Sequence, residues 1–296
     1  MHNLDSSTNW KFDKYQTHVV TVDDTSSAPV ISVIGTCRVH HPLRNLEKRG
    51  LIKLNNGGLA SFVHSTPEAL LRLKVLLGIG AYNPKIVKLQ VGESKDLKLS
   101  ADADFDLSDS DLLVVEVSTI KAVSINGSPL QFNEVNRHLC TPFGDYGQVL
   151  RKNINHAFNN RQNYVTPPDM ESPASLPPEY LDMINELRPV VMDKNLISAD
   201  LDKIRELAGI PVLLVNHINL PGQDGKLITS RNKLCKIMNE YAESKDVEIF
   251  NPSVMFESHK PEILLMKNGE DLNHYAKDQL GTVGDIQLEK IISSLV

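Results

Sequence analysis

Four short apolar runs alternate with helix-like segments along this chain, and this alternation limits the folds it can adopt. The runs are Val30–Ile34, Asp111–Ser118, Pro211–Asn216 and Val247–Phe250. Parallel strands that are covered on both faces read as continuous apolar runs, and helical crossovers separate them. We therefore expect an α/β domain with a mainly parallel, doubly wound sheet. Its ligands should bind beyond the carboxyl ends of the strands.

The first of these strands breaks at Gly35, and Cys37 follows two residues later. Pro42 favours the first turn of a helix, so we expect a helix over about 42–49. This order places the thiol of Cys37 at the carboxyl edge of the sheet, facing the amides of a helix N-terminus. Such amides lower a thiol pKa and can hold a developing oxyanion.

Asp271 and His274 stand three residues apart near the other end of the sequence, after the last predicted strand. Together with Cys37 they predict a Cys–His–Asp site for acyl transfer. His274 would take the thiol proton and return it to the leaving group, while Asp271 orients the ring. His40 or His41 could serve as an alternative base, although their positions equally suit flanking the helix start.

Further small or polar residues follow the predicted strands at the same edge of the sheet. As oxyanion or substrate-binding candidates we select Arg38, His40, Gly57, Gly58, Ser118 and Asn216. Glu116 lies inside an apolar run, where a carboxylate is either paired with an arginine or poised at the site. The sequence does not decide between these two roles.

The strand pattern stops between residues 120 and 207, which we interpret as a helical insertion. It is either a cap over the active edge or a helical layer packed elsewhere on the sheet. Residues 1–28 are predicted to form an arm or an edge strand, and residues 29–296 the α/β domain.

Composition argues against several classes of partner and cofactor. The net charge of −6, without a basic face, disfavours nucleic acid. Three widely spaced cysteines suggest neither a disulfide framework nor a metal site. Nucleotide-binding motifs are absent, which leaves a nicotinamide or nucleotide cofactor unsupported. No signal sequence or apolar run of membrane length is visible, so we expect a cytoplasmic protein with reduced thiols, no membrane partner and an oligomeric state that stays open.

The order of these blocks resembles the SGNH/GDSL hydrolase superfamily. Gly35-Thr36-Cys37 stands where that superfamily has Gly-x-Ser, Gly57 or Gly58 stands at its glycine loop, and Asp271-Leu272-Asn273-His274 matches its Asp-x-x-His. A cysteine at the nucleophile position is similar to the GSCFA-like and WcbI-like branches. The third block departs from the Gly-x-Asn-Asp pattern: Ser118 fills the position, and Asn216 follows a later strand. The resemblance implies a three-layer, flavodoxin-like domain.

The resemblance and the residues together predict acyl transfer through a cysteinyl thioester. The leading expectation is a hydrolase of an ester, thioester or amide that acts on a small acyl substrate without a cofactor. An acyl-CoA or another acyl thioester is a conceivable substrate. The first alternative is an acyltransferase to a sugar hydroxyl or amine in polysaccharide or secondary-metabolite biosynthesis. The second is a non-catalytic binding protein on the same scaffold.

Overall fold

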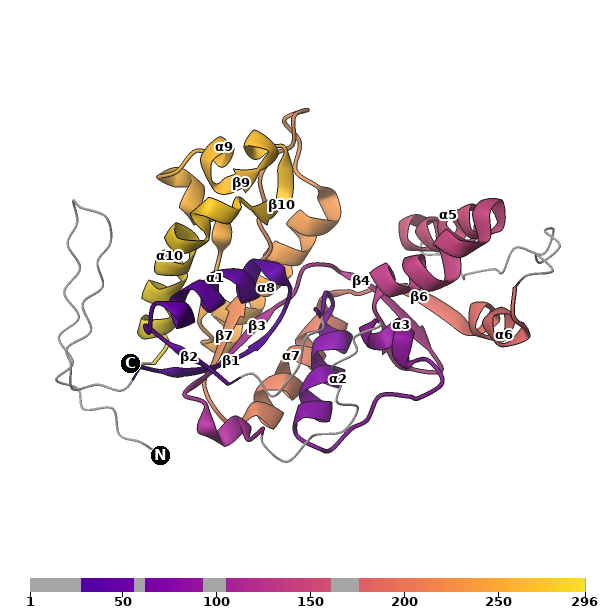
Figure 1. The fold of residues 1–296 in the computed structure, drawn as a ribbon, viewed down its shortest axis with the longest axis horizontal. Coiled ribbons are helices and arrows are strands. Elements are labelled where there is room, and N and C mark those ends of the chain that lie inside the picture. The colour runs from indigo at the N-terminus through magenta and orange to yellow at the C-terminus, as the bar shows by residue number, and fades with distance from the viewer. Residues whose placement is uncertain (1–27, 56–61, 93–104, 161–175, 296) are drawn as a thin grey trace. The chain divides into compact units, whose positions relative to one another are not determined.

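The computed structural model describes residues 28–55, 62–92, 105–160 and 176–295 (Figure 1). Residues 1–27 of the predicted arm, as well as Gly57 and Gly58, lie outside the described residues. The chain divides into two compact units. The described residues of the first unit are 28–55, 106–116 and 208–295, and those of the second are 62–92, 105, 117–160 and 176–207.

A five-stranded parallel sheet forms the centre of the first unit. Its order is β2-β1-β3-β7-β8, and its strands are β1 (Val30–Ile34), β2 (Lys53–Leu54), β3 (Leu112–Glu116), β7 (Val212–Val215) and β8 (Ile249–Phe250). Taken in chain order, this is the 2-1-3-4-5 arrangement of flavodoxin-like folds. The sheet confirms the predicted α/β class and the four predicted strands. Ile34 lies opposite Val115, and Glu116 lies opposite Val215, which brings the carboxyl ends of β1, β3 and β7 to one edge.

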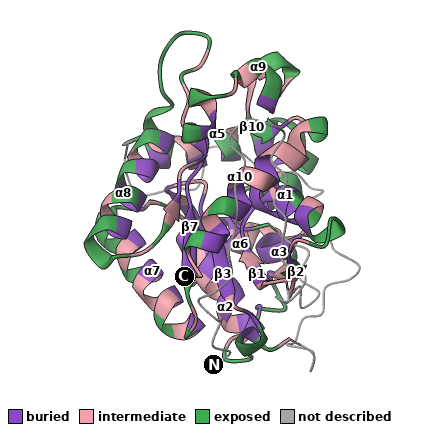
Figure 2. Cartoon of the chain, turned by 90° about the vertical axis from the view of Figure 1, so that its left-hand side faces the viewer, coloured by how far each residue is buried: buried purple, intermediate pink, exposed green. Residues whose placement is uncertain are grey.

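Helices cover both faces of this sheet and make the first unit three layers thick. Helices α1 (Cys37–Lys48) and α10 (Leu280–Ser293) pack against each other on one face, and α8 (Thr229–Lys245) lies on the other (Figure 2). Every residue of β3 and β7 is buried, so these strands are purple in Figure 2. The core between sheet and helices is aliphatic, with Ile31, Leu43 and Leu46 at most 1% exposed.

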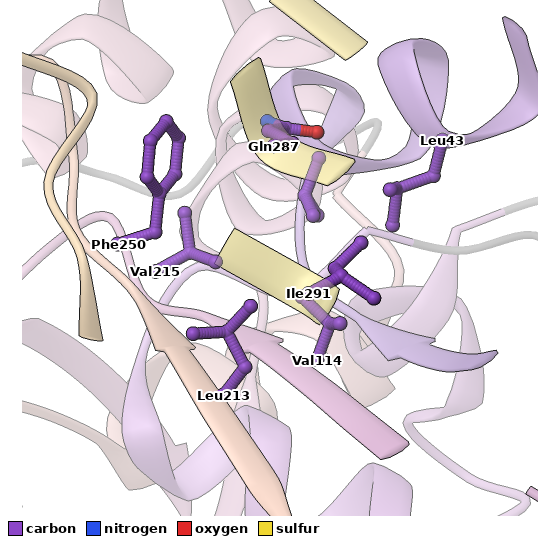
Figure 3. A pocket seen from close by; sticks show the side chains of 8 residues that line it. Leu43, Val114, Leu213, Val215, Phe250, Gln287 and Ile291 are labelled. Atoms are coloured by element: carbon purple, nitrogen blue, oxygen red, sulfur yellow. The ribbon is translucent and has the colours of Figure 1, made fainter. Parts of the chain in front are cut away.

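A small void lies in this core between the sheet and α1 and α10 (Figure 3). Its lining is Val39, Leu43, Val114, Leu213, Val215, Phe250, Gln287 and Ile291. Its free volume is about 10 Å³, which is at the lower limit for a single water molecule. The void is therefore a packing feature of the core and not a substrate pocket.

Helix α1 begins at Cys37, five residues earlier than Pro42 predicts. Pro42 lies inside the helix, where proline removes the N–H that would bond to the carbonyl four residues before it. That carbonyl belongs to Arg38, and the side-chain amide of Gln287 on α10 donates to it at 3.5 Å. This replacement donor explains how the helix continues through the proline. The prediction that the helix starts near Pro42 was wrong. The helix includes the proline because Gln287 donates the hydrogen bond to the Arg38 carbonyl that Pro42 cannot donate.

The candidate residues Asp271 and His274 lie on a short strand. Strand β10 (Asp271–Tyr275) pairs antiparallel with β9 (Leu265–Met266), which follows helix α9 (Pro261–Leu264). Short 3₁₀ helices complete the first unit at 107–109, 252–257, 267–269 and 277–279.

The second unit contains the predicted insertion and part of the chain before it. Its helices are α2 (Thr66–Leu76), α3 (Val87–Val91), α4 (Phe132–Val135), α5 (Gly144–Asn160), α6 (Pro178–Glu186) and α7 (Lys194–Ala208), with a π-helical turn at 136–140 and a 3₁₀ turn at 141–143. An antiparallel sheet in the order β5-β4-β6 accompanies them, formed by β5 (Ser128–Leu130), β4 (Lys121–Ile125) and β6 (Leu187–Val191). Segment 120–207 is thus not purely helical. Val123, Leu150 and Ile184 belong to its own apolar core.

Helices α5 and α8 each contain 17 residues. A helix needs about 20 apolar residues to span the hydrocarbon core of a bilayer. Within the described ranges, none combines the length and apolar character that a membrane crossing requires.

Candidate active site

The turn between β1 and α1 is held tightly against the end of β3. A Cβ on Gly35 would lie 2.6 Å from Cγ1 of Val39 and 2.8 Å from Cβ of Glu116, so only glycine fits between them. The next residue, Thr36, is the N-cap of α1, and its hydroxyl accepts from the N–H of Arg38 at 3.3 Å. Cys37, the first helical residue, is partly exposed. The turn therefore presents the thiol at the carboxyl edge of the sheet, as predicted from the sequence.

Glu116 is fully buried at the end of β3 and anchors this turn. Its Oε2 accepts from the backbone N–H of Thr36 at 2.7 Å and from the Thr36 hydroxyl at 2.5 Å. Its Oε1 accepts from Nε of Arg38 at 2.7 Å. A buried carboxylate needs such partners because water is excluded from it. Of the two roles left open by the sequence, the structure shows the pairing with an arginine.

Asp271 and His274 form a hydrogen-bonded pair on β10. Oδ2 of Asp271 lies 2.9 Å from Nδ1 of His274, and its Oδ1 accepts from the N–H of Asn273 at 2.9 Å. The His274 side chain is 50% exposed, whereas that of Asp271 is 17% exposed. A carboxylate bound to Nδ1 orients the ring and leaves Nε2 for proton transfer. The pair has the geometry expected of a base and its orienting acid.

Arg38 connects this pair to the turn that carries Cys37. Its Nη1 donates to the carbonyl of Asn273 at 3.2 Å, so the residue after Cys37 binds the residue before His274. Burial is the largest influence that lowers the pKa of His41, and the neighbouring Arg44, His274 and Lys277 lower it further. Helix α1 and strand β10 are thus neighbours, and the two ends of the predicted triad lie in one region of the first unit.

The pKa of the Cys37 thiol is raised, which corrects the expectation that the helix N-terminus lowers it. Burial is the largest influence and raises the pKa, and the Glu116 carboxylate raises it further. The Arg38 guanidinium and the backbone N–H groups of Cys37 and Arg38 oppose this effect without cancelling it. The thiol is therefore protonated at neutral pH and needs a base to become a nucleophile.

Ser118 and Asn216, selected as oxyanion or substrate-binding residues, are engaged elsewhere. Ser118 belongs to the second unit, where its N–H and its hydroxyl donate to the carbonyl of His64 at 2.8 and 3.4 Å. Asn216 is buried, and its amide nitrogen donates to Oδ1 of Asn239 on α8 at 2.7 Å. His40 is buried in α1. The role of each of these residues stays a prediction.

Two residues beside the pair, Arg231 and Tyr275, were not predicted from the sequence. Arg231, on α8, donates to the carbonyls of Ile218 and Leu272 at 3.0 and 3.3 Å and to Oδ1 of Asn273 at 2.8 Å. Tyr275 is buried next to His274. Burial raises the pKa of its phenol well above its usual range, and the charges of Arg38, Glu116 and Cys37 also act on it. Arg231 was missed because no local sequence pattern links a helix residue to a strand about 40 residues later.

The other two cysteines differ from Cys37 in burial and surroundings. Cys140 and Cys235 are buried, and burial raises the pKa of Cys140 to about 11. Cys235 donates to the carbonyl of His217 at 3.5 Å. In the described part of the chain, no group of three or more histidine, cysteine or carboxylate side chains is placed to hold a metal ion.

Comparison with known proteins places the chain in a family. A relative, the Vi polysaccharide biosynthesis protein TviD of Salmonella typhi, is 25% identical over 251 residues, which are 83% of this chain and 29% of that protein. The chain thus spans less than a third of the length of this curated relative.

Similar solved structures include a GDSL-like lipase from Bacteroides thetaiotaomicron, with 9% identity, a TM-score of 0.39 and coverage of 90% of this chain and 89% of the lipase. A catalytic mutant of an acetylxylan esterase from Geobacillus stearothermophilus shows 7% identity, a TM-score of 0.40 and coverage of 92% and 96%. Residues 29–289 match the family described as the TviD N-terminal domain, and the chain belongs to this family.

Proposed function

We propose that the chain is an acyl-transfer enzyme in which Cys37 forms a thioester, His274 transfers the proton and Asp271 orients His274. The observation that carries the proposal is the Asp271–His274 pair, at 2.9 Å, on a strand that Arg38 joins to the start of α1. A nucleophile, a base and an orienting carboxylate on neighbouring elements are the parts that covalent acyl transfer needs.

In the proposed first half-reaction, Sγ of Cys37 attacks the acyl carbonyl carbon while Nε2 of His274 takes the thiol proton. The bond from the carbonyl carbon to the leaving group then breaks, and His274 returns the proton to the leaving group. In the second half-reaction, a hydroxyl, an amine or water attacks the thioester and gives its proton to His274. The carbon–sulfur bond breaks, and Cys37 recovers a proton as the thiol. Because Nδ1 of His274 faces Asp271, Nε2 is the atom that moves the proton.

The raised pKa of Cys37 favours general-base activation over a resting thiolate. A protonated thiol attacks only when a base removes its proton during the reaction. The half-exposed ring of His274 is accessible for this role. The amide of Cys37 at the first helical position is a candidate oxyanion donor.

Two acceptors are distinguished by separate observations. The relative's name, a polysaccharide biosynthesis protein, supports a sugar hydroxyl or amine as the acceptor. An acyl-CoA or another acyl thioester is proposed as the donor from the thioester chemistry alone. The 50% exposure of the His274 side chain lets water reach the base and supports hydrolysis as the second candidate. Both reactions pass through the same acyl-enzyme.

The proposal is tested by intact-protein mass spectrometry after brief exposure to a panel of acyl thioesters and activated esters. Wild type is compared with Cys37→Ala, His274→Ala and, as a matched control, Cys235→Ala. We expect an acyl adduct in wild type and Cys235→Ala, none in Cys37→Ala, and slower formation in His274→Ala. Decay of the adduct with sugar alcohols or amines, relative to water alone, separates transfer from hydrolysis. Equal labelling of wild type and Cys37→Ala, or no adduct at all, would favour the alternative hypothesis of a non-catalytic binding protein.

A further inference from the structure

The segment of β10 that carries His274 is only partly held by its neighbouring strand. Asp271 lies opposite Met266, and Tyr275 lies opposite the adjacent residue Leu265. The three residues between them on β10 consequently have no residue opposite them on β9, and both strands lie in the described part of the chain. Such a bulge breaks the ladder of backbone hydrogen bonds and leaves polar groups to be satisfied in another way.

Two buried arginines supply donors to this bulge. Nη1 of Arg38 donates to the carbonyl of Asn273 at 3.2 Å, and Nη1 of Arg231 donates to the carbonyl of Leu272 at 3.3 Å. Nη2 of Arg231 also donates to Oδ1 of Asn273 at 2.8 Å. Both carbonyls between Asp271 and His274 are therefore bound by side chains from other elements.

Each arginine is itself anchored. Arg38 is fixed by Glu116, which also holds the Thr36 turn. Arg231 is the third residue of α8, is 8% exposed, and donates to the carbonyl of Ile218 after β7. Arginine suits this task because its planar group offers several donors in a rigid fork.

Substituting Arg38 would change the surroundings of Cys37 directly, whereas substituting Arg231 would not. Arg38 follows Cys37 directly, and its charge acts on the thiol. Arg231 is absent from the influences on the Cys37 pKa, and its contacts with the candidate site go to Leu272 and Asn273. A substitution of Arg231 therefore removes two contacts with the bulge without changing the residue next to Cys37.

We propose that Arg231 is a positioning residue: by holding Leu272 and Asn273, it fixes the direction in which β10 presents His274 to Cys37. This inference rests on the proposed function, because it assigns Arg231 an effect on acyl transfer that passes through His274. A base displaced by about 1 Å can lose about 100-fold in rate.

The test is a double-mutant cycle on the rate of Cys37 acylation by an activated acyl ester, followed by intact-protein mass spectrometry. Its four proteins are wild type, Arg231→Met, His274→Ala and the double variant. We expect Arg231→Met to slow acylation about 100-fold and to have no further effect when His274 is already alanine. An equal slowing in both backgrounds, or no slowing in wild type, would overturn the proposal.

Two further variants separate positioning from a general loss of stability or charge. Arg49→Met is the matched control: Arg49 pairs with Asp285 at 2.6 Å in the same unit, away from β10, and its loss should leave the rate unchanged. Arg231→Lys keeps the positive charge but loses the planar group with several donors. We therefore expect it to acylate more slowly than wild type and faster than Arg231→Met. The comparison of Arg231→Lys with wild type also serves as the test if Arg231→Met is too unstable to assay. A wild-type acylation rate in Arg231→Lys would overturn the proposed positioning role of Arg231.

Hydrogen exchange of the peptide spanning residues 271–276 gives a readout that needs no acyl chemistry. We expect faster exchange in Arg231→Met than in wild type and Arg49→Met. If wild type and His274→Ala acylate equally, the proposed function fails. Faster exchange in Arg231→Met would then show that Arg231 anchors the strand without an effect on acylation, and the positioning role would be overturned as well. Unchanged exchange in Arg231→Met would show that Arg231 does not hold this strand segment, even where His274 proves to be the base.

Discussion

Arg38 Nη1 donates to the carbonyl of Asn273 at 3.2 Å, although 235 residues separate the two in the sequence. The same guanidinium is bound by Glu116 through Nε. The turn that carries Cys37 and the strand that carries His274 therefore share one buried charge pair. Disturbing that pair should affect both ends of the candidate site at once.

Replacing Glu116 by alanine should destabilise the protein strongly. It leaves the Arg38 guanidinium buried without its carboxylate and removes the acceptor of two Thr36 donors. Removing one partner of a buried ion pair costs about 3–5 kcal/mol, which chemical denaturation would measure. Glu248→Ala is the control, because the partly exposed pair of Glu248 with Lys290 should be worth about 1 kcal/mol or less. Equal losses in the two variants would contradict the anchoring role of Glu116.

Asp271→Asn should lower the rate of Cys37 acylation. An asparagine beside Nδ1 favours the wrong histidine tautomer, a change that costs up to about 10⁴-fold in a serine-protease triad. The variant is assayed beside Asp278→Asn, whose carboxylate lies on an exposed turn after β10 and should be dispensable. A rate in Asp271→Asn equal to that of wild type would remove Asp271 from the proposed triad.

The Asp271 carboxylate should stay ionised well into the acidic range. Burial raises its pKa, but the hydrogen bonds from His274 and from the N–H of Asn273 outweigh burial and hold the pKa below the ordinary 3.8. The stabilisation from this pair is therefore present above pH 3.8 and is lost as the pH falls through the lower folded value. In a pH series of thermal melts, wild type and Asp271→Asn should differ at pH 5–8 and converge toward pH 3. A difference that vanishes already near pH 6 would contradict the lowered pKa.

The central sheet was predictable because β3 and β7 are buried throughout and, like the partly buried β1, read as apolar runs. Strand β6 was missed because Arg188 and Pro189 interrupt its apolar pattern, and it becomes regular only by pairing with β4. The start of α1 was missed for a related reason. Proline at position 42 looks like a first turn, and only Gln287, about 250 residues away, supplies the missing donor.

For the candidate site, local sequence signals were sufficient for some residues and insufficient for others. Asp271 and His274 were predictable because they meet within one strand. Arg231 reaches the same strand from α8, so its contacts exist only in the folded chain. The Cys37 pKa depends on a balance between burial and helix amides, and burial cannot be read from neighbouring residues.

Gly35→Ala should destabilise the turn before Cys37. The added Cβ would meet Val39 at 2.6 Å and Glu116 at 2.8 Å, and neither neighbour can move without shifting α1 or β3. Overpacking of this kind costs about 1–3 kcal/mol, and urea denaturation would measure it. Gly281→Ala is the matched control, because its Cβ would find Asn45 at an ordinary 3.6 Å in the first turn of α10. Equal stability of the two variants would show that the turn is not tightly held.

Cys37 should react slowly with iodoacetamide at neutral pH and faster as the pH rises. Its pKa lies above the ordinary thiol value because burial disfavours the thiolate more than Arg38 and the helix amides favour it. A raised pKa means a small thiolate fraction at pH 7, so the rate should keep increasing through pH 9 without a plateau. Peptide mass spectrometry separates this signal from Cys140, whose pKa of about 11 makes it slower still.

A plateau with a midpoint below about pH 8 would contradict this prediction, since a free thiol titrates near 8.5. It would indicate a resting thiolate paired with an imidazolium, and His274→Ala should then abolish the plateau. With the raised pKa, His274→Ala should instead leave iodoacetamide alkylation nearly unchanged while slowing acylation by esters. That contrast follows from general-base catalysis, in which the histidine acts on the thiol during attack on the carbonyl and not in the resting enzyme.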